Sequence, residues 1–547
     1  MDFRLPLKEF LRRVDAHPHR SYLHQPERRT WQTLTWAEVD DQARRIASGL
    51  LALGCAPGDR VAILAKNCAE WFIADFAIAM AGLVSVPIYT TAGAPTIAHI
   101  LSHSAAKAIF VGKLDSTVAA EEAIAAELPR IAMPYPTLPA QHHWQSWLEN
   151  HQPLQDVAKP APDDTMTLVY TSGSTGLPKG VVLSFRNIAA SSDCSAASFD
   201  MRPEDRCVSY LPLAHITERC AVEWTSVYGG NEIFFTESLD TFIDDVSHAQ
   251  PTVFVSVPRL WTKFQSEILA RIPDTKLQRL LHIPLINTLV SRKLRKGLGL
   301  DKCRLSGSGS APISPSILQW YSRIGINICE GWGMTETSGL SCAAIPFEFE
   351  LIGTIGRPVN CVAMKLSDIG EILIRGDAVF SAYYRNPEAT REAIIDGWFH
   401  TGDLGEQLPN GAYKIIGRVK EQFKTGKGKY VSPAPIENLL GRNSDIEQVC
   451  VLGSGRKQPV AIVIISEHLH GARESTQQRL AATLTEVNNE LESHQRLDNI
   501  IVGEGAWTTD NHLLTPTLKI RRNKLEEIYA RLVDEEYADI VVWEADL

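Results

Sequence analysis

The residues from Tyr170 to Gly180 read YTSGSTGLPKG and lie between two apolar segments. Three kinds of residue in this loop suit the binding of phosphate. Glycines let backbone N–H groups approach an anion, hydroxyls donate further hydrogen bonds, and a lysine supplies positive charge. The loop therefore predicts a site for the phosphates of ATP. We expect its ligands to come from Thr171, Ser172, Gly173, Ser174, Thr175, Gly176 and Lys179.

This loop differs from a Walker A motif. That motif has glycine immediately before its lysine and serine or threonine after it, whereas Pro178 precedes Lys179 and Gly180 follows it. A P-loop NTPase is therefore excluded. The alternative is an ordinary surface loop, in which glycine, serine and threonine are common. The full eleven-residue arrangement favours the phosphate-binding interpretation.

Four further motifs follow the loop. They read LPLAH at 211–215, EGWGMTE at 330–336, WFHTGD at 398–403 and GR at 417–418. Together with the loop, in this order, they resemble the acyl-adenylate-forming superfamily, which includes acyl-CoA synthetases, luciferases and the adenylation domains of peptide synthetases. The resemblance covers about residues 30 to 530. It implies an enzyme that joins a carboxylic acid to the AMP part of ATP and then passes the acyl group to a thiol.

Adenylation spreads negative charge over phosphate oxygens, so it requires cations and hydrogen-bond donors. The resemblance implies that Glu336 is a Mg²⁺-binding carboxylate and that Thr335 is a phosphate-binding hydroxyl. It also implies that Lys519, in the segment LTPTLKIRR, bridges the acyl carboxylate and the α-phosphate. Losing one such donor often costs about 10²- to 10³-fold in rate. Seen alone, Thr-Glu would be an ordinary helix start and Lys519 part of a solvated basic run.

The resemblance also implies contacts to the rest of the nucleotide. Trp332 occupies the position of an aromatic ring, often tyrosine, that stacks on adenine in the family. Asp403 matches a residue that accepts hydrogen bonds from ribose, and Arg418 matches one that contacts ribose or phosphate. Small residues allow close approach of backbone to adenine. The remaining candidates in these motifs are Gly309, Ser310, Ala311, Pro312, Glu330, Gly331, Gly333 and Met334.

Three other positions concern the acid and the thiol. His215 matches a residue that helps to place the carboxylate or lines the acyl entrance, with a structural role as the alternative. Lys420 matches the hinge about which the family rotates its C-terminal domain between adenylation and thiol transfer. Gly426 and Gly428 would let the next loop line the pantetheine tunnel, although its spacing departs from the commonest family pattern by about one residue.

Four segments narrow the resemblance to long-chain fatty acyl-CoA synthetases: LPLAHITER at 211–219, PTVFVSVPRLW at 251–261, KGKYVSPAPIE at 427–437 and TPTLKIRR at 515–522. This implies a medium- to long-chain fatty acid, ATP, Mg²⁺ and CoA as substrates and cofactors. Each methylene that is buried contributes about 0.8 kcal/mol, so an apolar tunnel would stabilise a bound acyl chain.

Three alternatives stay open at this point. One is a ligase that loads an acyl carrier protein, and another is a β-lactone-forming relative that uses only the adenylation chemistry. The third is a non-catalytic sensor of acyl groups or nucleotides. Retention of Glu336, Asp403, Arg418 and Lys519 together argues against the sensor.

The elements that must position these residues follow an alternating pattern. Short β-branched runs recur between helix-like segments, which predicts largely parallel α/β sheets. The runs lie at 60–64, 108–111, 167–170, 207–211, 252–257, 303–305 and 326–329. Hairpin-like patterns near 370–375 and 411–416 predict a β-rich subdomain.

The predicted fold is thus α/β, with a large N-terminal domain of layered sheets and a β-rich subdomain, and a small mobile α+β C-terminal domain. We expect the AMP-binding and acyl-binding domain to span residues 1–419 and the mobile domain to span 420–547, with the active site between them.

The bulk properties agree with an enzyme of this kind. The chain has 547 residues and a net charge of −10, which argues against nucleic acid as its main partner. Its ten cysteines form no CxxC pair, which argues against a zinc site or a disulfide framework and predicts a cytoplasmic location. We expect no signal peptide. The apolar stretch 71–89 contains Asp75 and predicts a buried helix followed by a strand, not a membrane span. Peripheral membrane contact and oligomeric state stay open.

Overall fold

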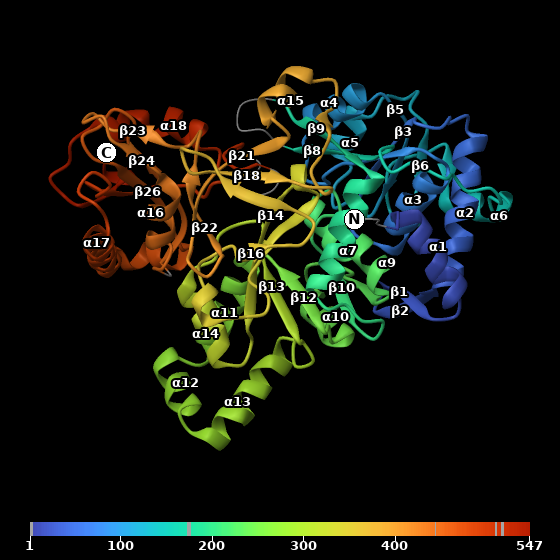
Figure 1. Cartoon of the computed structure of the whole chain (residues 1–547). Coiled ribbons are helices and arrows are strands. Elements are labelled where there is room, and N and C mark those ends of the chain that lie inside the picture. Colours follow the sequence, from blue (N-terminus) through green and yellow to red (C-terminus); the bar gives the residue numbers. More distant parts are fainter. Residues whose placement is uncertain (1–3, 172–176, 444, 509–510, 516–518) are drawn as a thin grey trace. The chain divides into compact units, whose positions relative to one another are not determined.

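The computed structural model describes residues 4–171, 177–443, 445–508, 511–515 and 519–547. Helices and strands alternate along most of this part of the chain (Figure 1). The α-helices are α1 (Pro6–Ala16), α2 (Trp36–Ala52), α3 (Ala69–Met80), α4 (Ala94–Ser104), α5 (Val118–Ala123), α6 (Trp144–Asn150), α7 (Phe185–Ser198), α8 (Ile216–Glu218), α9 (Thr225–Gly229), α10 (Phe242–Ala249), α11 (Pro258–Arg271), α12 (Asp274–Leu281), α13 (Pro284–Gly297), α14 (Pro315–Arg323), α15 (Pro387–Ala393), α16 (Pro433–Leu440), α17 (Arg473–Glu490) and α18 (Arg522–Asp534). A π-helix, η1 (Arg219–Trp224), and four 3-10 helices complete the set: η2 (Thr335–Thr337), η3 (Phe349–Leu351), η4 (Glu467–Ala472) and η5 (Glu544–Asp546).

The largest sheet carries the predicted phosphate loop between two of its strands. Its order is β19 (Ala382–Tyr383), β9 (Lys179–Ser184), β8 (Thr165–Thr171), β4 (Val84–Pro87), β3 (Arg60–Ala65), β5 (Ala106–Gly112), β6 (Arg130–Ala132) and β7 (His142–His143). From β8 to β7 neighbouring strands are parallel, whereas β9 is antiparallel to β8 and β19 is antiparallel to β9.

Two further sheets are also mainly parallel. The first has the order β10 (Arg206–Ser209), β11 (Glu232–Phe235), β1 (Ser21–Glu27) and β2 (Thr30–Thr35), of which β2 alone is antiparallel to its neighbour. The second has the order β12 (Val253–Ser256), β13 (Leu305–Ser308), β14 (Ile328–Met334), β15 (Gly339–Ala343) and β16 (Arg357–Pro358). Here β12, β13 and β14 are parallel, and β15 and β16 continue as antiparallel strands.

The remaining strands form three smaller sheets. One has the order β17 (Ala363–Leu366), β18 (Glu371–Arg375), β21 (Trp398–Gln407) and β20 (Ile394–Ile395), and β22 (Tyr413–Arg418) pairs with β21. A two-stranded ribbon contains β23 (Phe423–Lys424) and β24 (Tyr430–Val431). The last sheet has the order β25 (Ile446–Leu452), β26 (Val460–Ile465), β27 (Ile500–Val502) and β28 (Val541–Trp543).

Local sequence explains where several helices begin. Thr35 caps α2 and Ser184 caps α7, each accepting a hydrogen bond from the backbone N–H of the third helical residue. Helix α3 is apolar on every side and almost entirely buried, as expected of a helix inside a core. The stretch 71–89 is therefore a buried helix followed by β4, as the sequence predicts.

The chain forms two compact units. The first comprises Met1–Ala311, Ile317–Met364 and Ile374–Phe399, and the second comprises Pro312–Ser316, Lys365–Leu373 and His400–Leu547. The main core of the first unit surrounds α2 and α3, and a second core lies on α4 and α5. In the second unit, two cores contain alternate residues of β25, β26 and β27. The predicted boundary after residue 419 stays a prediction.

A buried ionic cluster lies within the first unit. Arg219 is fully buried, and its guanidinium donates to Asp75 across 2.5 Å and to the Thr167 hydroxyl across 2.6 Å. Glu223, one turn along the same helical segment, is also buried, and burial raises its pKa well above the usual range. Such a cluster favours one arrangement of its helices, because separating its partners would leave buried charge.

The structure also describes the cysteines and the hydrophobicity of the helices. All ten cysteines are free thiols, and nine of them are buried. Among the helices that the structure describes, none has both the length and the hydrophobicity needed to cross a bilayer.

Candidate active site

Strands β8 and β9 bring the two ends of the predicted phosphate loop together. They pair in antiparallel register, with Thr171 opposite Lys179. Thr171 is half-buried and Lys179 is exposed. Ser172, Gly173, Ser174, Thr175 and Gly176 lie outside the described residues. The structure therefore places the first and last predicted ligands of the loop side by side.

A tyrosine connects Lys179 with Glu336. Strand β19 pairs with β9, and this pairing places the Tyr383 ring 5.1 Å from the Lys179 ammonium. The Tyr383 hydroxyl donates to Glu336 Oε1 across 2.8 Å. Burial, together with the neighbouring carboxylate, raises the pKa of Tyr383, so its hydroxyl stays protonated and remains a donor at neutral pH. Tyr383 was not among the predicted site residues.

Glu336 and Thr335 lie in the 3-10 helix η2, directly after β14. The Glu336 side chain is buried, and its backbone carbonyl accepts a hydrogen bond from the Phe380 N–H across 2.8 Å. The hydroxyl of Thr337 accepts from the Met334 N–H across 3.0 Å, which closes the same turn. Thr335 is half-buried. The backbone of this motif is thus fixed from both sides.

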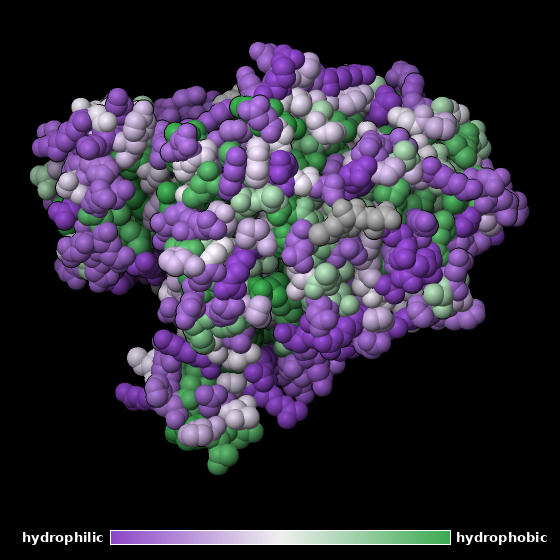
Figure 2. Space-filling view, in the orientation of Figure 1, coloured by the Kyte–Doolittle hydropathy of each residue, from purple (hydrophilic) through white to green (hydrophobic). Residues whose placement is uncertain are grey.

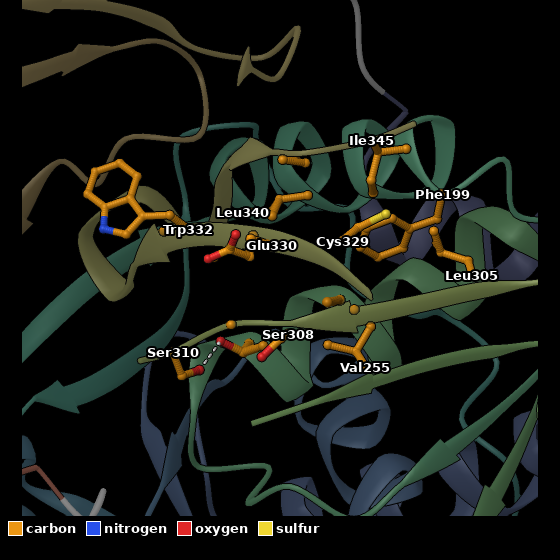
Figure 3. Close-up of a pocket in the computed structure, with 18 residues that line it drawn as sticks. Phe199, Val255, Leu305, Ser308, Ser310, Cys329, Glu330, Trp332, Leu340 and Ile345 are labelled. Atoms are coloured by element: carbon orange, nitrogen blue, oxygen red, sulfur yellow. Dashed lines mark hydrogen bonds between the residues drawn. The ribbon is translucent and has the colours of Figure 1, made fainter. Parts of the chain in front are cut away.

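A cavity of about 60 Å³ lies beside this turn (Figure 3). Strands β13 and β14 pair with Ser308 opposite Glu330, so the two small-residue motifs run along the same cavity. Figure 3 shows Trp332 at one end and Phe199 and Leu305 at the other. The predicted nucleotide ligands that line the cavity are Gly309, Ser310, Glu330, Gly331, Trp332 and Gly333.

Three residues of the predicted segments 309–312 and 330–334 do not line this cavity. Met334 ends β14 next to it, and Ala311 follows Ser310 as an exposed residue. Pro312 is the first residue of a short segment that belongs to the second unit. The cavity therefore accounts for part of the predicted nucleotide set.

Glu330 is an acidic group in largely apolar surroundings. Its Oε2 accepts a hydrogen bond from the Gly353 N–H across 2.8 Å. Burial raises the pKa of its carboxyl to about 8, because ionisation in an apolar environment is unfavourable. At neutral pH the side chain is therefore mainly protonated and can donate a hydrogen bond into the cavity.

Gly333 occupies a position where no larger residue fits without movement. A Cβ atom there would lie 1.5 Å from the Gly339 carbonyl oxygen and 3.1 Å from the Ser341 N–H nitrogen. The ladder between β14 and β15 is irregular at this point, which brings the two backbones together. This glycine is thus required by the approach of β15.

His215 caps the short helix α8. Its Nδ1 accepts a hydrogen bond from the Thr217 N–H across 3.2 Å, which fixes the ring relative to the start of the helix. Glu218, three residues later, accepts from the Ser209 hydroxyl and the Tyr210 N–H at 2.7 and 3.0 Å. Together these contacts hold the segment from 211 to 219 in place. The predicted role of His215 at the acid carboxylate stays a prediction.

In the second unit, Asp403 and Arg418 form a cross-strand pair. They lie opposite each other on β21 and β22, and Arg418 Nε is 2.6 Å from Asp403 Oδ1. The Asp403 side chain is 5% exposed, whereas that of Arg418 is 44% exposed. The two predicted ribose-site residues are therefore neighbours, and the arginine holds the buried carboxylate in one orientation.

The predicted hinge and thiol-loop residues occupy turns. Lys420 is exposed in the turn that follows β22. Gly426 and Gly428 are exposed in the turn between β23 and β24, and Gly428 has a φ of +77°, which favours glycine. The Gly426 N–H donates to the Arg456 carbonyl across 2.6 Å. This turn is thereby attached to the segment between β25 and β26.

Lys519 is bonded to the segment that ends at Thr515. An isolated bridge joins Leu514 and Ile520, and the Thr515 N–H donates to the Lys519 carbonyl across 2.8 Å. The Lys519 N–H donates in return to the Thr515 hydroxyl across 3.1 Å. The side chain of Lys519 is exposed. Its backbone is therefore fixed while its ammonium reaches solvent.

A protein-only metal site is absent from the described part of the chain. No group of three or more histidine, cysteine, aspartate or glutamate side chains there could hold an ion. Among these residues, Glu336 therefore belongs to no such group.

Two family models match the chain. One, described as AMP-binding enzyme, matches residues 10–384, and the other, described as AMP-binding enzyme C-terminal domain, matches residues 421–541. Two curated relatives are each 32% identical to the chain. They are the peroxisomal long chain acyl-CoA synthetase 7 of Arabidopsis thaliana and the long-chain-fatty-acid–CoA ligase FadD15 of Mycobacterium bovis. The matches cover 93% of this chain and 82% and 92% of the relatives, respectively.

Solved structures show the same fold. The o-succinylbenzoate CoA synthetase of Bacillus subtilis, in complex with its acyl-adenylate intermediate, superimposes with a TM-score of 0.76. The match covers 96% of this chain and 99% of the synthetase at 22% identity. This confirms the predicted α/β fold with a large N-terminal and a small C-terminal part. The chain belongs to the AMP-binding enzyme family, and within it resembles the long-chain acyl-CoA synthetases.

Proposed function

We propose that this chain joins a medium- to long-chain fatty acid to CoA in two steps, consuming ATP and releasing AMP and pyrophosphate. The observation that carries this proposal is the cavity between β13 and β14. Trp332 and the segment from Gly309 to Ser310 offer an aromatic face and close backbone at one end, and Phe199 and Leu305 offer apolar side chains at the other. Such a cavity suits a molecule that is a nucleotide at one end and an alkyl chain at the other.

The relatives supply the reaction class. Both are named as ligases or synthetases that form long-chain acyl-CoA, and both match nearly the whole chain. Acid–thiol ligation is therefore the activity that we infer, with CoA as the accepting thiol. A cytoplasmic location and mobility of the C-terminal domain about Lys420 belong to the same proposal.

In the first step, a carboxylate oxygen of the acid attacks the α-phosphorus of ATP and pyrophosphate leaves. Lys179 and the loop between β8 and β9 would hold the phosphates, and Glu336, which accepts from the Tyr383 hydroxyl, would lie next to them. Lys519 would bridge the acid carboxylate and the α-phosphate, where negative charge develops. Asp403, held by Arg418, would accept hydrogen bonds from the ribose hydroxyls.

Glu336 suits Mg²⁺ in its donor chemistry. Magnesium in phosphate-transfer sites commonly takes one or two carboxylates and completes its shell with phosphate oxygens and water. One buried carboxylate beside the predicted phosphate loop fits this pattern. The described residues contain no group of three or more His, Cys, Asp or Glu side chains that could hold an ion. When bound, the ion would neutralise charge on the phosphate oxygens.

In the second step, the CoA thiol attacks the acyl carbon, its proton is released, and AMP leaves with the original carboxylate oxygen. We propose that a rotation about Lys420 brings the turn with Gly426 and Gly428 to the pantetheine arm. The cavity must also widen, because ligand pockets commonly measure about 300 to 1,000 Å³. Side chains such as Phe199 and Leu305 would move apart when the acyl chain enters.

The test measures pyrophosphate release and thioester formation separately, with acetate, aromatic acids and fatty acids of increasing length. We expect release to require a fatty acid and thioester to form with CoA. Preference for acetate or an aromatic acid would overturn the substrate class. If thioester forms with an acyl carrier protein but not with CoA, the chain is the alternative ligase. If the acid causes pyrophosphate release but neither thiol accepts the acyl group, the result favours chemistry limited to adenylation.

A further inference from the structure

Helices α12 and α13 form a hairpin that extends from the rest of the first unit (Figure 1). Leu277 of α12 is fully buried, and Trp320 of α14 donates to Asp274 across 3.2 Å. At the other end of the hairpin, Arg295 donates to the Ile324 carbonyl across 3.3 Å. The hairpin is therefore attached to its unit along one side and presents its other side to solvent.

The solvent side carries large apolar residues. Ile283 connects the two helices and is 48% exposed, and Leu285 and Leu289 of α13 are 83% and 69% exposed. The two leucines are four residues apart, so they lie on the same face of the helix. Figure 2 shows hydrophobic residues gathered at the end of this hairpin. Exposed apolar groups that gather in this way are unfavourable in water and mark an interaction surface.

Basic residues continue the same face. Arg292 lies three residues after Leu289, and Lys296 lies four residues after Arg292. Both are exposed, as is Lys293 beside them. Residues 271–302 contain eight lysines and arginines and two aspartates, a net charge of +6, although the whole chain carries −10. Positive charge is thus concentrated on the segment that also exposes leucine.

We propose that the end of the α12–α13 hairpin, with Ile283, Leu285, Leu289, Arg292 and Lys296 as its contact residues, docks on the anionic surface of a phospholipid membrane. Interfacial helices bind such surfaces by burying apolar side chains at the boundary of headgroups and acyl chains while lysine and arginine contact anionic headgroups.

A second exposed leucine shows why the charge matters. Leu239 is 86% exposed, more than either leucine of the hairpin, but its neighbours in sequence include Glu237 and Asp240. Acidic side chains would be repelled by anionic headgroups. Leu239 therefore offers apolar surface without electrostatic attraction and serves as a matched control.

The docking itself does not depend on the proposed activity. If the chain does activate fatty acids, which is the part that rests on the proposed function, the hairpin would hold the enzyme where its water-insoluble substrate partitions. Membrane binding is measured without ATP or CoA, so its failure and a failure of the ligase assay are separate results.

The experiment is co-sedimentation of the full chain with vesicles of phosphatidylcholine, alone or with about 30% phosphatidylglycerol. We expect binding to the anionic vesicles that weakens strongly in about 0.5 M salt, because salt screens the attraction. The double variant Leu285→Ser, Leu289→Ser and the double variant Arg292→Glu, Lys296→Glu should each lower the affinity about ten-fold or more.

Two variants control for general effects. Leu239→Ser removes an exposed leucine elsewhere, and Lys107→Glu with Lys159→Glu makes the same charge change at two other exposed lysines. Both should bind as the unchanged chain does, and all variants should keep its melting temperature. Absence of binding to anionic vesicles, or equal losses in the controls, would overturn the proposal. So would a dimer in light scattering that the Leu285→Ser, Leu289→Ser variant dissociates, because the surface would then join two copies of the chain.

Discussion

The two units hold their candidate residues in different ways. In the first unit, Glu336 is buried, its carboxylate accepts from Tyr383, and its backbone is bonded to Phe380. In the second unit, Asp403 is likewise buried and held by Arg418, but Lys420 and Lys519 have exposed side chains. The difference teaches that chemistry and stability are linked at Glu336 and separable at Lys420 and Lys519. A substitution at Glu336 or its partners changes packing, whereas one at Lys519 removes mainly a charge.

The largest effect is expected at Lys519. Lys519→Ala should slow acyl-AMP formation from acid and ATP by about 10²- to 10³-fold, because one preorganised cation is lost from the developing charge. The melting temperature should stay unchanged, since the side chain is exposed. A single-turnover assay of acyl-AMP formation measures the rate, and thermal unfolding measures the melting temperature.

Two other substitutions make this result specific. Lys524→Ala removes an exposed lysine on α18 and should leave the rate unchanged. Lys420→Pro should slow transfer from presynthesised acyl-AMP to CoA but spare adenylation, because a fixed φ restricts the proposed pivot. Equal losses of both steps in both Lys519→Ala and Lys420→Pro would contradict the division of labour.

Tyr383→Phe should have the next largest effect. It removes the hydroxyl that donates to Glu336, and a hydrogen bond to a charged group contributes about 1.5 to 3 kcal/mol. We expect adenylation to slow by about ten-fold or more, with a lower melting temperature as well. Tyr384→Phe is the neighbouring control. A Tyr383→Phe variant with the full rate would show that Glu336 is positioned by other contacts.

Gly333→Ala tests whether the first unit links stability to chemistry. The added Cβ would overlap the Gly339 carbonyl, and overpacking commonly costs about 1 to 3 kcal/mol. We expect a melting temperature several degrees lower and weaker nucleotide binding, measured by calorimetry. Gly297→Ala adds a Cβ where no atom lies within 4 Å and should not destabilise the fold. Unchanged stability of Gly333→Ala would mean that β14 and β15 can separate freely.

The last effect concerns pH. Burial raises the pKa of Glu330 to about 8, from an ordinary value of 4.5. Between these values the folded chain keeps a proton that the unfolded chain has released, so the contribution of Glu330 to the free energy of unfolding falls as pH rises. Glu330→Gln cannot ionise, and its melting temperature should therefore decline less than that of the unchanged chain from about pH 5 to 8. Parallel curves for both proteins would contradict the shifted pKa.

Much of the fold could be predicted from sequence because strand and helix periods are local. The runs at 60–64, 108–111 and 167–170 fall within β3, β5 and β8. The run at 303–305 was less accurate, because β13 begins at Leu305 and ends at Ser308. Its start is set by pairing with Val253 of β12, and its end contains Gly307, which has low strand propensity.

The contacts of the candidate site could be predicted only in part. Motifs identified Glu336, Lys179 and Trp332 as candidates because their types and order carry the resemblance. Tyr383 was missed because its contact with Glu336 depends on pairing between β19 and β9, about two hundred residues apart in sequence. The only local signal for this residue in the sequence is the pair of tyrosines, Tyr383 and Tyr384, shortly before Asn386-Pro387. The raised pKa of Glu330 likewise depends on burial, which no local pattern contains.

The register of β8 and β9 has a consequence for which changes of length the chain can accept. Val181 and Leu183 pack into the core around α2 and α3, whereas Val182 packs against the core on α4 and α5. An insertion or deletion of one residue inside β9 would exchange these faces and move Val182 into the wrong core. An insertion between Thr171 and Lys179 can leave the pairing intact. Natural variants of this chain should therefore keep the count of residues within the two strands, whereas the length of the loop is restricted by phosphate binding and not by the register.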